Sequence, residues 1–288
     1  MNILKALCIA LSTYTNLPLP KLKLEGKPMK YAVIFFPFAG LLVGGAEYLV
    51  YLLFKYVDLP VFAMTVLISV VPILLTRGIH LNGYMHSLDA LSFGGKQEKR
   101  LEIMRDLHVG AYSVIRMFVY VGLFLASVYM LLFYSYDNSL LTYSPDELFG
   151  GAAPDNSLNQ YTIKQLVTVW CLGFMLARVM SAISTVTFYF KDKSGLAYHF
   201  SGRGEDGKIN KTALGFLLVE LVITIAAMLS VNFMAGGVLI GITALTFVFY
   251  RFYSLNKFGG FAGDLAGWFV CLSELFMTLA AAVLAIIA

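Results

Sequence analysis

Hydrophobic residues dominate the chain in long continuous runs, and shorter polar segments separate these runs. A helix needs about 20 mostly apolar residues to cross the hydrocarbon core of a membrane. None of the runs sustains the two-residue alternation of a membrane-spanning strand. The pattern predicts an all-α polytopic membrane protein that forms one domain over residues 1–288. Its seven predicted spans lie at about residues 31–54, 59–79, 112–134, 164–189, 212–232, 235–251 and 266–287.

Two short stretches refine this prediction. The apolar residues 3–13 are too few to cross the membrane. A secretory signal peptide is the alternative, but no small-residue cleavage site follows, and Pro18 and Pro20 interrupt the sequence. We expect a retained helix that is interfacial or re-entrant. The segment NFMAGG, between the fifth and sixth spans, predicts a tight helical hairpin.

Basic residues gather in four polar segments, at residues 20–30, 93–108, 190–211 and 251–257. Two predicted spans separate each of these segments from the next, which places all four on one side of the membrane. Cytoplasmic loops are enriched in Lys and Arg, so this side is predicted to be cytoplasmic in a prokaryotic inner membrane. Segment 135–161 has four acidic residues and no Lys or Arg. It falls on the opposite side, as does the C-terminus.

Composition supports a chain that is dissolved mostly in lipid. Hydrophobic residues make up 59% of the sequence and charged residues 13%, against about 45–50% and about 25% in soluble domains. The net charge of +4 does not indicate a nucleic-acid partner, because the basic residues lie between spans. Cys8, Cys171 and Cys271 are scattered, so neither a zinc site nor a disulfide framework is indicated.

Polar chemistry concentrates in residues 77–112. Asn82, His86 and Asp89 are spaced by four and then three residues, so a helix would place them on one face. Glu102 and Asp106 repeat a spacing of four. Two such faces at a membrane mouth would suit a divalent ion, because Mg²⁺ prefers oxygen ligands. The simpler alternative is a solvated helix end of mixed charge.

Further polar residues are candidates for substrate binding. Arg100 and Arg105 would hold phosphate oxygens, whereas His80 is either a ligand or an ordinary interfacial histidine. Arg178 and Glu274 lie within apolar spans, where a charge costs about 3 kcal/mol on insertion scales. They have a functional role or form a structural pair.

Asp264 lies among four glycines at the start of the last predicted span. Glycines permit close approach of a ligand to the backbone. The glycines also suit close helix packing, and Asp264 is equally suited to cap the helix.

Several blocks, in order and nearly end to end, resemble the cobalamin synthase family, adenosylcobinamide-GDP ribazoletransferase. The segment GIHLNGYMHSLDAL resembles the family signature H-x-D-G-x-x-D-x-x-D-[GA]. The segment KRLEIMRDLHVG resembles a stretch read as E-I-[ML]-[KR]-D-x-x-x-G. Further matches are ALSTYTNLPLP, YAVIFFPFAGLLVGG, LARVMSA, KSGLA and FGGFAGDLAG.

The resemblance implies an integral membrane enzyme that acts late in vitamin B12 assembly. Such an enzyme joins α-ribazole, or its 5′-phosphate, to adenosylcobinamide-GDP, releases GMP and requires Mg²⁺. Its partners are these substrates and the lipid bilayer. We expect Asp89 and Asp106 to be the metal ligands and catalytic residues, with Asn82, His86 and Glu102 supporting them. The expected substrate-binding residues are His80, Arg100, Arg105, His108, Arg178, Lys257 and Asp264.

The chain departs from the family pattern at the signature aspartates, which read Asn82, His86 and Asp89, and at an N-terminal arginine, which reads Asn16. Loss of one carboxylate 4 Å from a divalent ion removes on the order of 8 kcal/mol of gross attraction before desolvation, at an effective dielectric near 20. Histidine favours ions such as Mn²⁺, Fe²⁺ or Zn²⁺. A rearranged site, another metal and a weakened homologue are the three possible explanations.

The sequence is also compatible with two other classes of protein. A transporter would need its polar residues near the membrane midplane and paired broken helices. A phosphatidyltransferase that uses a CDP-linked alcohol shares the metal-and-aspartate chemistry, but this chain lacks its longer D-G…A-R…G…D…D spacing.

Overall fold

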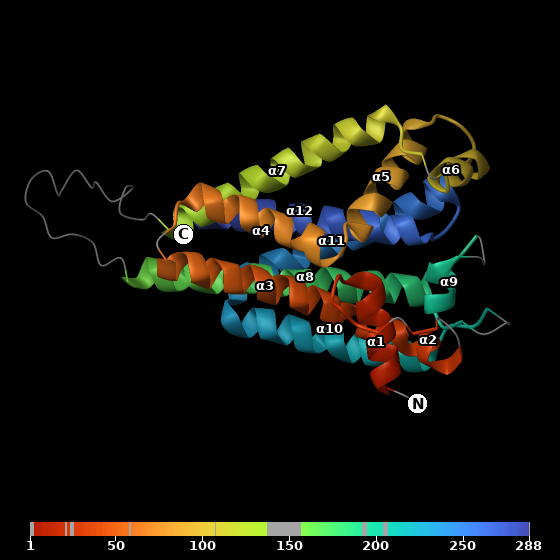
Figure 1. Cartoon of the computed structure of the whole chain (residues 1–288), viewed down its shortest axis with the longest axis horizontal. Helices are drawn as coiled ribbons and strands as arrows, with labels where there is room; N and C mark the ends of the chain where they lie inside the picture. The colour runs from red at the N-terminus through yellow and green to blue at the C-terminus, as the bar shows by residue number, and fades with distance from the viewer. Residues whose placement is uncertain are drawn as a thin grey trace, which may run out of the picture.

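The computed structural model describes residues 3–20, 22–23, 26–57, 59–106, 108–136, 157–191, 195–203 and 207–287 (Figure 1). These residues form helices and no strand; a single isolated bridge joins Phe190 to Phe261. The helices are α1 Ile3–Tyr14, α2 Gly26–Ala32, η1 Val33–Phe35, α3 Phe36–Val57, α4 Val61–Leu75, α5 Ile79–Ser92, α6 Gln97–Met104, α7 Ala111–Tyr136, α8 Ser157–Thr187, α9 Leu196–Phe200, α10 Lys211–Val231, α11 Phe233–Phe258 and α12 Gly263–Ile287.

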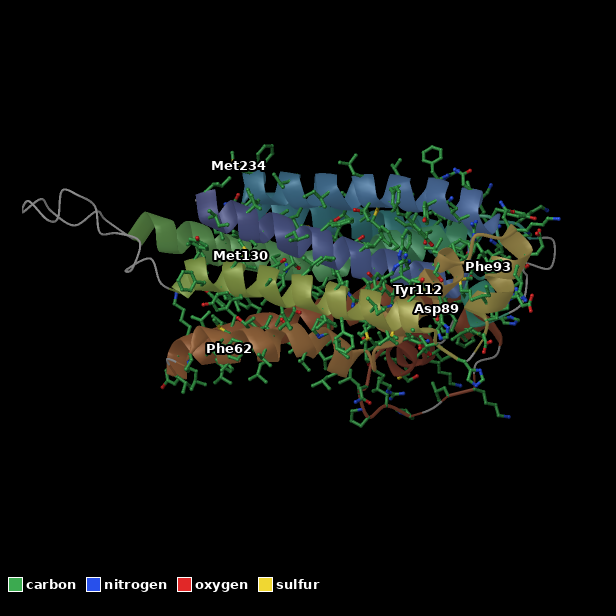
Figure 2. All side chains as sticks on the ribbon, turned by 90° about the horizontal axis from the view of Figure 1, so that it is seen from above. Phe62, Asp89, Phe93, Tyr112, Met130 and Met234 are labelled. Carbon is green, nitrogen blue, oxygen red and sulfur yellow. The ribbon has the colours of Figure 1, made fainter. Side chains whose placement is uncertain are left out.

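Six helical stretches are long and apolar enough to cross a membrane, and the number rises to seven if α4 and α5 count as one bent span. The six are Pro28–Val57, Ala111–Tyr134, Ile163–Thr187, Lys211–Val231, Phe233–Phe258 and Gly263–Ile287. Phe62, Met130 and Met234 are exposed on the outside of the bundle, where lipid would contact them (Figure 2). The prediction of an all-α multi-pass membrane protein is therefore confirmed.

We expected residues 59–79 to form a single helix, but the structure differs from this prediction. Helix α4 ends at Leu75, and α5 then leaves at 84° to it. Arg77 adopts a left-handed conformation, with φ 53°, and the Gly78 N–H donates to the Ile73 carbonyl at 2.9 Å. A left-handed residue with this hydrogen bond is a Schellman motif, which ends a helix. The family-like signature therefore lies on a separate helix, α5.

The N-terminal segment is fixed to this bend. After α1, the backbone N–H of Asn16 donates to the Leu75 carbonyl at 2.6 Å. The side chain of Asn16 accepts a hydrogen bond from Arg77 Nε at 3.0 Å. Asn16, which stands where the family pattern has an arginine, thus helps to hold the only non-glycine residue with positive φ among the described residues. The location of α1 relative to the membrane stays a prediction.

Glycines bring the central helices into backbone contact. A Cβ atom on Gly40 or Gly44 of α3 would overlap the Phe174 or Cys171 carbonyl oxygen of α8. A Cβ on Gly83 of α5 would lie 2.8 Å from the Asp264 carbonyl oxygen at the start of α12. Small residues permit such close approach between membrane helices. As a result, α5 is held directly against α12.

The hairpin between α10 and α11 is tighter than predicted. We expected the second helix to begin at residue 235, but α11 begins at Phe233 and continues to Phe258. Asn232 both ends α10 and caps α11, and its side chain accepts a hydrogen bond from the Ala235 N–H at 2.9 Å. An asparagine at this position satisfies an otherwise unpaired helix N–H, so a single residue is enough to turn the chain. Most of the predicted acidic loop, 137–156, lies outside the described residues.

Helices α1, α2, α6 and α9 gather at one end of the bundle, and the C-terminus lies at the other (Figure 1). The described residues of all four predicted basic segments lie at the end with α1, α2, α6 and α9. The structure therefore agrees with the arrangement of loops that the basic segments predicted.

Candidate active site

A cavity of about 400 Å³ opens at the basic end of the bundle. Helices α1, α3, α5, α6, α8, α9 and α12 all contribute residues to its wall. His80, Arg105 and Asp264, three of the predicted substrate-binding residues, line it together. The cavity is therefore the place where residues far apart in the sequence converge.

The contact between α5 and α12 positions His80 beside the start of α12. A Cβ on Gly267 would lie 2.9 Å from the carbonyl oxygen of His80, so the two backbones are in direct contact there. The imidazole of His80 is stacked on the ring of Tyr14 from α1, with 6.4 Å between centroids. Its side chain is only 7% exposed, and Nε2 has no hydrogen-bond partner among the described residues.

Two of the family-like blocks meet in another part of the wall. The backbone N–H of Phe261, in FGGFAGDLAG, donates to the Tyr189 carbonyl at 2.7 Å. Ala197, in KSGLA, lies close to Gly263, because a Cβ on that glycine would be 3.1 Å from the alanine Cβ. Asp264 follows in the first turn of α12, where the helix dipole favours negative charge. Its carboxylate makes no hydrogen bond with the described residues.

Asp89 lies outside the cavity lining and holds the start of α7 (Figure 2). Its Oδ2 accepts a hydrogen bond from the backbone N–H of Gly110, and its Oδ1 accepts one from Ser113 at 3.2 Å. These are backbone donors at a helix N-terminus, which a carboxylate from another helix satisfies here. The last aspartate of the signature therefore has a structural task.

Replacement of Asp89 by alanine tests this task. The change removes the acceptor for two backbone donors, so we expect the free energy of unfolding to fall by about 1–3 kcal/mol. Asp89→Asn keeps one acceptor and should lose less. Thermal unfolding in detergent measures both variants. An Asp89→Ala protein with unchanged thermal stability and lost activity would show that capping is not the main role of this side chain.

Asp106, His108 and Glu102 lie on the exposed surface. Asp106 accepts hydrogen bonds from the backbone N–H and from Nδ1 of His108, both at 2.9 Å. These two hydrogen bonds lower the pKa of Asp106 below its usual value. Glu102 pairs with Lys99 at 2.8 Å. None of the three residues lines the cavity.

His86 is buried on α5, and its Nδ1 has no hydrogen-bond partner among the described residues. It interacts electrostatically with both Asp106 and Asp264. Asn82, one helical turn earlier, is exposed. Neither His86 nor Asn82 lines the cavity.

Of the predicted phosphate-binding residues, only Arg105 lines the cavity. Arg100 instead joins α6 to the end of α11, because Nε donates to the Phe93 carbonyl at 3.1 Å and Nη1 donates to the Lys257 carbonyl at 3.2 Å. The ammonium of Lys257 lies 6.0 Å from the centroid of the Tyr253 ring. The structure therefore gives Arg100 and Lys257 structural contacts.

Arg178 and Glu274 form a buried ion pair inside the bundle. Arg178 Nη1 lies 2.6 Å from Glu274 Oε1, and the arginine side chain is completely buried. Glu47 of α3 is also fully buried and interacts electrostatically with both residues, but it has no hydrogen-bond partner among the described residues. Of the two open interpretations, the structure shows the structural pair.

Residues 6–282 match the family described as cobalamin-5-phosphate synthase. The chain belongs to this family. A relative from Lachnoclostridium phytofermentans, named adenosylcobinamide-GDP ribazoletransferase, is 30% identical over 97% of this chain and 94% of its own length. A relative of the same name from Clostridium perfringens strain SM101 is 26% identical over 94% of each chain. No solved structure matches.

The family resemblance implies Mg²⁺, so the described residues were compared with the ligands that this ion needs. Among the described residues, no three His, Cys, Asp or Glu side chains lie close enough together to hold an ion. Mg²⁺ commonly uses one or two carboxylates together with substrate phosphates and water. Asp264 has an uncommitted carboxylate, and it is the one carboxylate in the described cavity lining. The donor set fits an ion that is shared with a phosphate-bearing substrate.

Sequence reasoning missed the aromatic wall of this family member's cavity. Tyr14, Phe36, Phe190 and Phe261 all line it. Each lies in or beside a block that resembles the family, but aromatic residues are frequent in membrane spans, so residue type gave no signal. The position of these blocks at the ends of apolar runs was the available clue. The metal roles of Asp89 and Asp106 stay predictions.

Proposed function

We propose that this chain is a membrane-bound adenosylcobinamide-GDP ribazoletransferase. A hydroxyl oxygen of α-ribazole, or of its 5′-phosphate, forms a bond to the phosphorus next to cobinamide. The pyrophosphate P–O bond breaks, GMP leaves with the bonding electrons, and the hydroxyl releases a proton. The observation that carries this proposal is the relative of that name, which is 30% identical and aligns over 97% of this chain.

The residues around the cavity suit the steps of such a transfer. Arg105 lines the cavity and would bind phosphate oxygens through charge-assisted hydrogen bonds. Mg²⁺, when bound, would neutralise charge on the pyrophosphate. Asp264, the one carboxylate in the described cavity lining, would hold it together with substrate phosphates and water. The hydroxyl proton would pass to water.

The proposed active site faces the cytoplasm of a prokaryotic cell. The cavity lies at the end of the bundle that carries the basic segments, and cytoplasmic loops are enriched in Lys and Arg.

The function is tested with purified protein in phospholipid vesicles. Adenosylcobinamide-GDP, α-ribazole and Mg²⁺ are added, and GMP and the joined corrinoid are measured by chromatography. We expect equal amounts of both products, and neither product without α-ribazole. Folded protein that releases no GMP with Mg²⁺, Mn²⁺ or Zn²⁺ would contradict the proposal.

The altered signature gives a separate prediction. In the double variant Asn82→Asp and His86→Asp, two added carboxylates should attract a divalent cation, so we expect half-maximal GMP release at a Mg²⁺ concentration at least tenfold lower. Mg²⁺ should also raise the thermal stability of the variant more than that of the unchanged protein.

The matched control for this pair is Asn256→Asp with His199→Asp, because both residues are exposed at the same end of the bundle. It adds the same charges on α9 and α11 instead of on the signature helix α5, and should leave the Mg²⁺ dependence unchanged. If both double variants respond equally to Mg²⁺, position 86 has no special relation to the ion.

A further inference from the structure

The cavity wall presents aromatic rings that suit a flat ligand. The rings of Tyr14 and His80 are nearly parallel, with an interplanar angle of 11°, and the centroid of Phe36 lies 5.7 Å from that of the His80 imidazole. Phe190 and Phe261, with 4.7 Å between centroids, line the same cavity. Aromatic side chains bind planar aromatic rings through face and edge contacts. The wall therefore suits a fused aromatic ring system.

The wall also contains polar side chains, which are those of Tyr14, His80, Arg105, Ser181, Thr185 and Asp264. Within the described lining, His80 Nε2 is the one side-chain atom that is both buried and without a hydrogen-bond partner. The hydroxyl of Thr185, another lining residue, already donates to the Ser181 carbonyl at 3.0 Å. Buried polar groups in proteins nearly always have partners. A ligand with one matching polar atom on an otherwise apolar ring would supply the missing one.

The size of the cavity separates the two substrates. A volume of about 400 Å³ lies at the lower end of the range of small-molecule pockets. A nucleoside suits this volume, whereas a corrin macrocycle with its amide side chains is several times larger than a nucleoside. The guanine of the other substrate carries several donors and acceptors around its edge. The aromatic side chains of the wall would leave most of these groups unpaired, which costs binding energy.

We propose that the cavity binds the benzimidazole-type base of the nucleoside substrate, with His80 Nε2 donating a hydrogen bond to its free ring nitrogen. The proposal rests on the transferase function proposed above. The ribose then lies toward Arg105 and Asp264, and the corrinoid stays outside the cavity. His80 is in this case a specificity-determining residue for the base.

A substrate pair tests the hydrogen bond directly. The α-riboside of 5,6-dimethylindole has a CH group in place of the free ring nitrogen of α-ribazole. With the unchanged protein, we expect the KM for the indole riboside to be about tenfold higher, with kcat little changed. His80→Phe keeps a ring but removes the donor, so the two ribosides should have similar KM values. His199→Phe, an exposed histidine outside the cavity lining, should retain the discrimination.

Equal discrimination by the unchanged protein and by His80→Phe would overturn the proposal while leaving the transferase function intact. Binding to the unchanged protein, measured by calorimetry without the corrinoid, supplies a test that needs neither turnover nor a folded variant. We expect α-ribazole to bind and GMP not to displace it. Displacement by GMP would assign the cavity to the nucleotide and refute the proposal.

Discussion

Gly44→Ala is expected to prevent α3 and α8 from packing as they do in the native bundle. A Cβ on Gly44 would overlap the carbonyl oxygen of Cys171, which belongs to the helix backbone and cannot rotate away. The two helices would have to separate along a contact that also includes Gly40. Overpacking typically lowers the free energy of unfolding by about 1–3 kcal/mol. Because the contacted atom belongs to the backbone of α8, we expect a loss of at least about 3 kcal/mol for Gly44→Ala. The yield of folded, monodisperse protein and its thermal midpoint in detergent measure the effect.

The neighbouring residue supplies a matched control. Gly45 is on the same helix, and a Cβ there would have no neighbour within 4 Å. Gly45→Ala should therefore leave stability unchanged or raise it slightly, because alanine favours the helix by about 1 kcal/mol. If both substitutions reduce the yield to the same extent, a general intolerance of α3, rather than the contact with α8, is responsible.

The arrangement of the helices was largely readable from the sequence because each span must be apolar over a fixed length. The same argument could not locate the end of α4. That helix stops inside an apolar run because Arg77 adopts a left-handed conformation, which residue type alone does not predict. Consequently the signature helix α5 runs at 84° to α4 instead of continuing it.

Side-chain roles were harder to predict than helices. Helical spacing correctly grouped His86 with Asp89 on the buried part of α5. It gave no information on the partner of Asp89, because the start of α7 approaches from 21 residues further along the chain. A carboxylate that binds a metal and one that caps a helix look identical in sequence. The cavity itself depends on contacts between α1, α5, α8 and α12, so its walls became visible only in three dimensions.

The cavity and the buried ion pair are parts of one polar system in the bundle. Ser181 and Thr185, which line the cavity, follow Arg178 by one and two helical turns on α8. Arg178 also interacts electrostatically with His80. The ion pair therefore lies one helical turn along α8 from a residue of the cavity wall, without lining the cavity.

Arg178→Ala is expected to lower the free energy of unfolding by about 3–5 kcal/mol, because it leaves a buried carboxylate without its cation. The Glu274 carboxylate loses a partner at 2.6 Å, and Glu47 loses a nearby positive charge. Adding Glu274→Gln to Arg178→Ala should recover part of the loss, since one unpaired buried carboxylate is removed. Unfolding in detergent, followed by circular dichroism, measures each variant.

Lys164→Ala is the matched control for this loss, because it removes a cation from the exposed part of the same helix. Surface charges contribute about 0–1 kcal/mol, so its unfolding free energy should be nearly unchanged. Arg178→Ala and Glu274→Gln act on one interaction, and their effects should therefore be non-additive. Strict additivity would mean that the 2.6 Å pair contributes no coupling, and the loss in Arg178→Ala would then come from the packing of its side chain against α3.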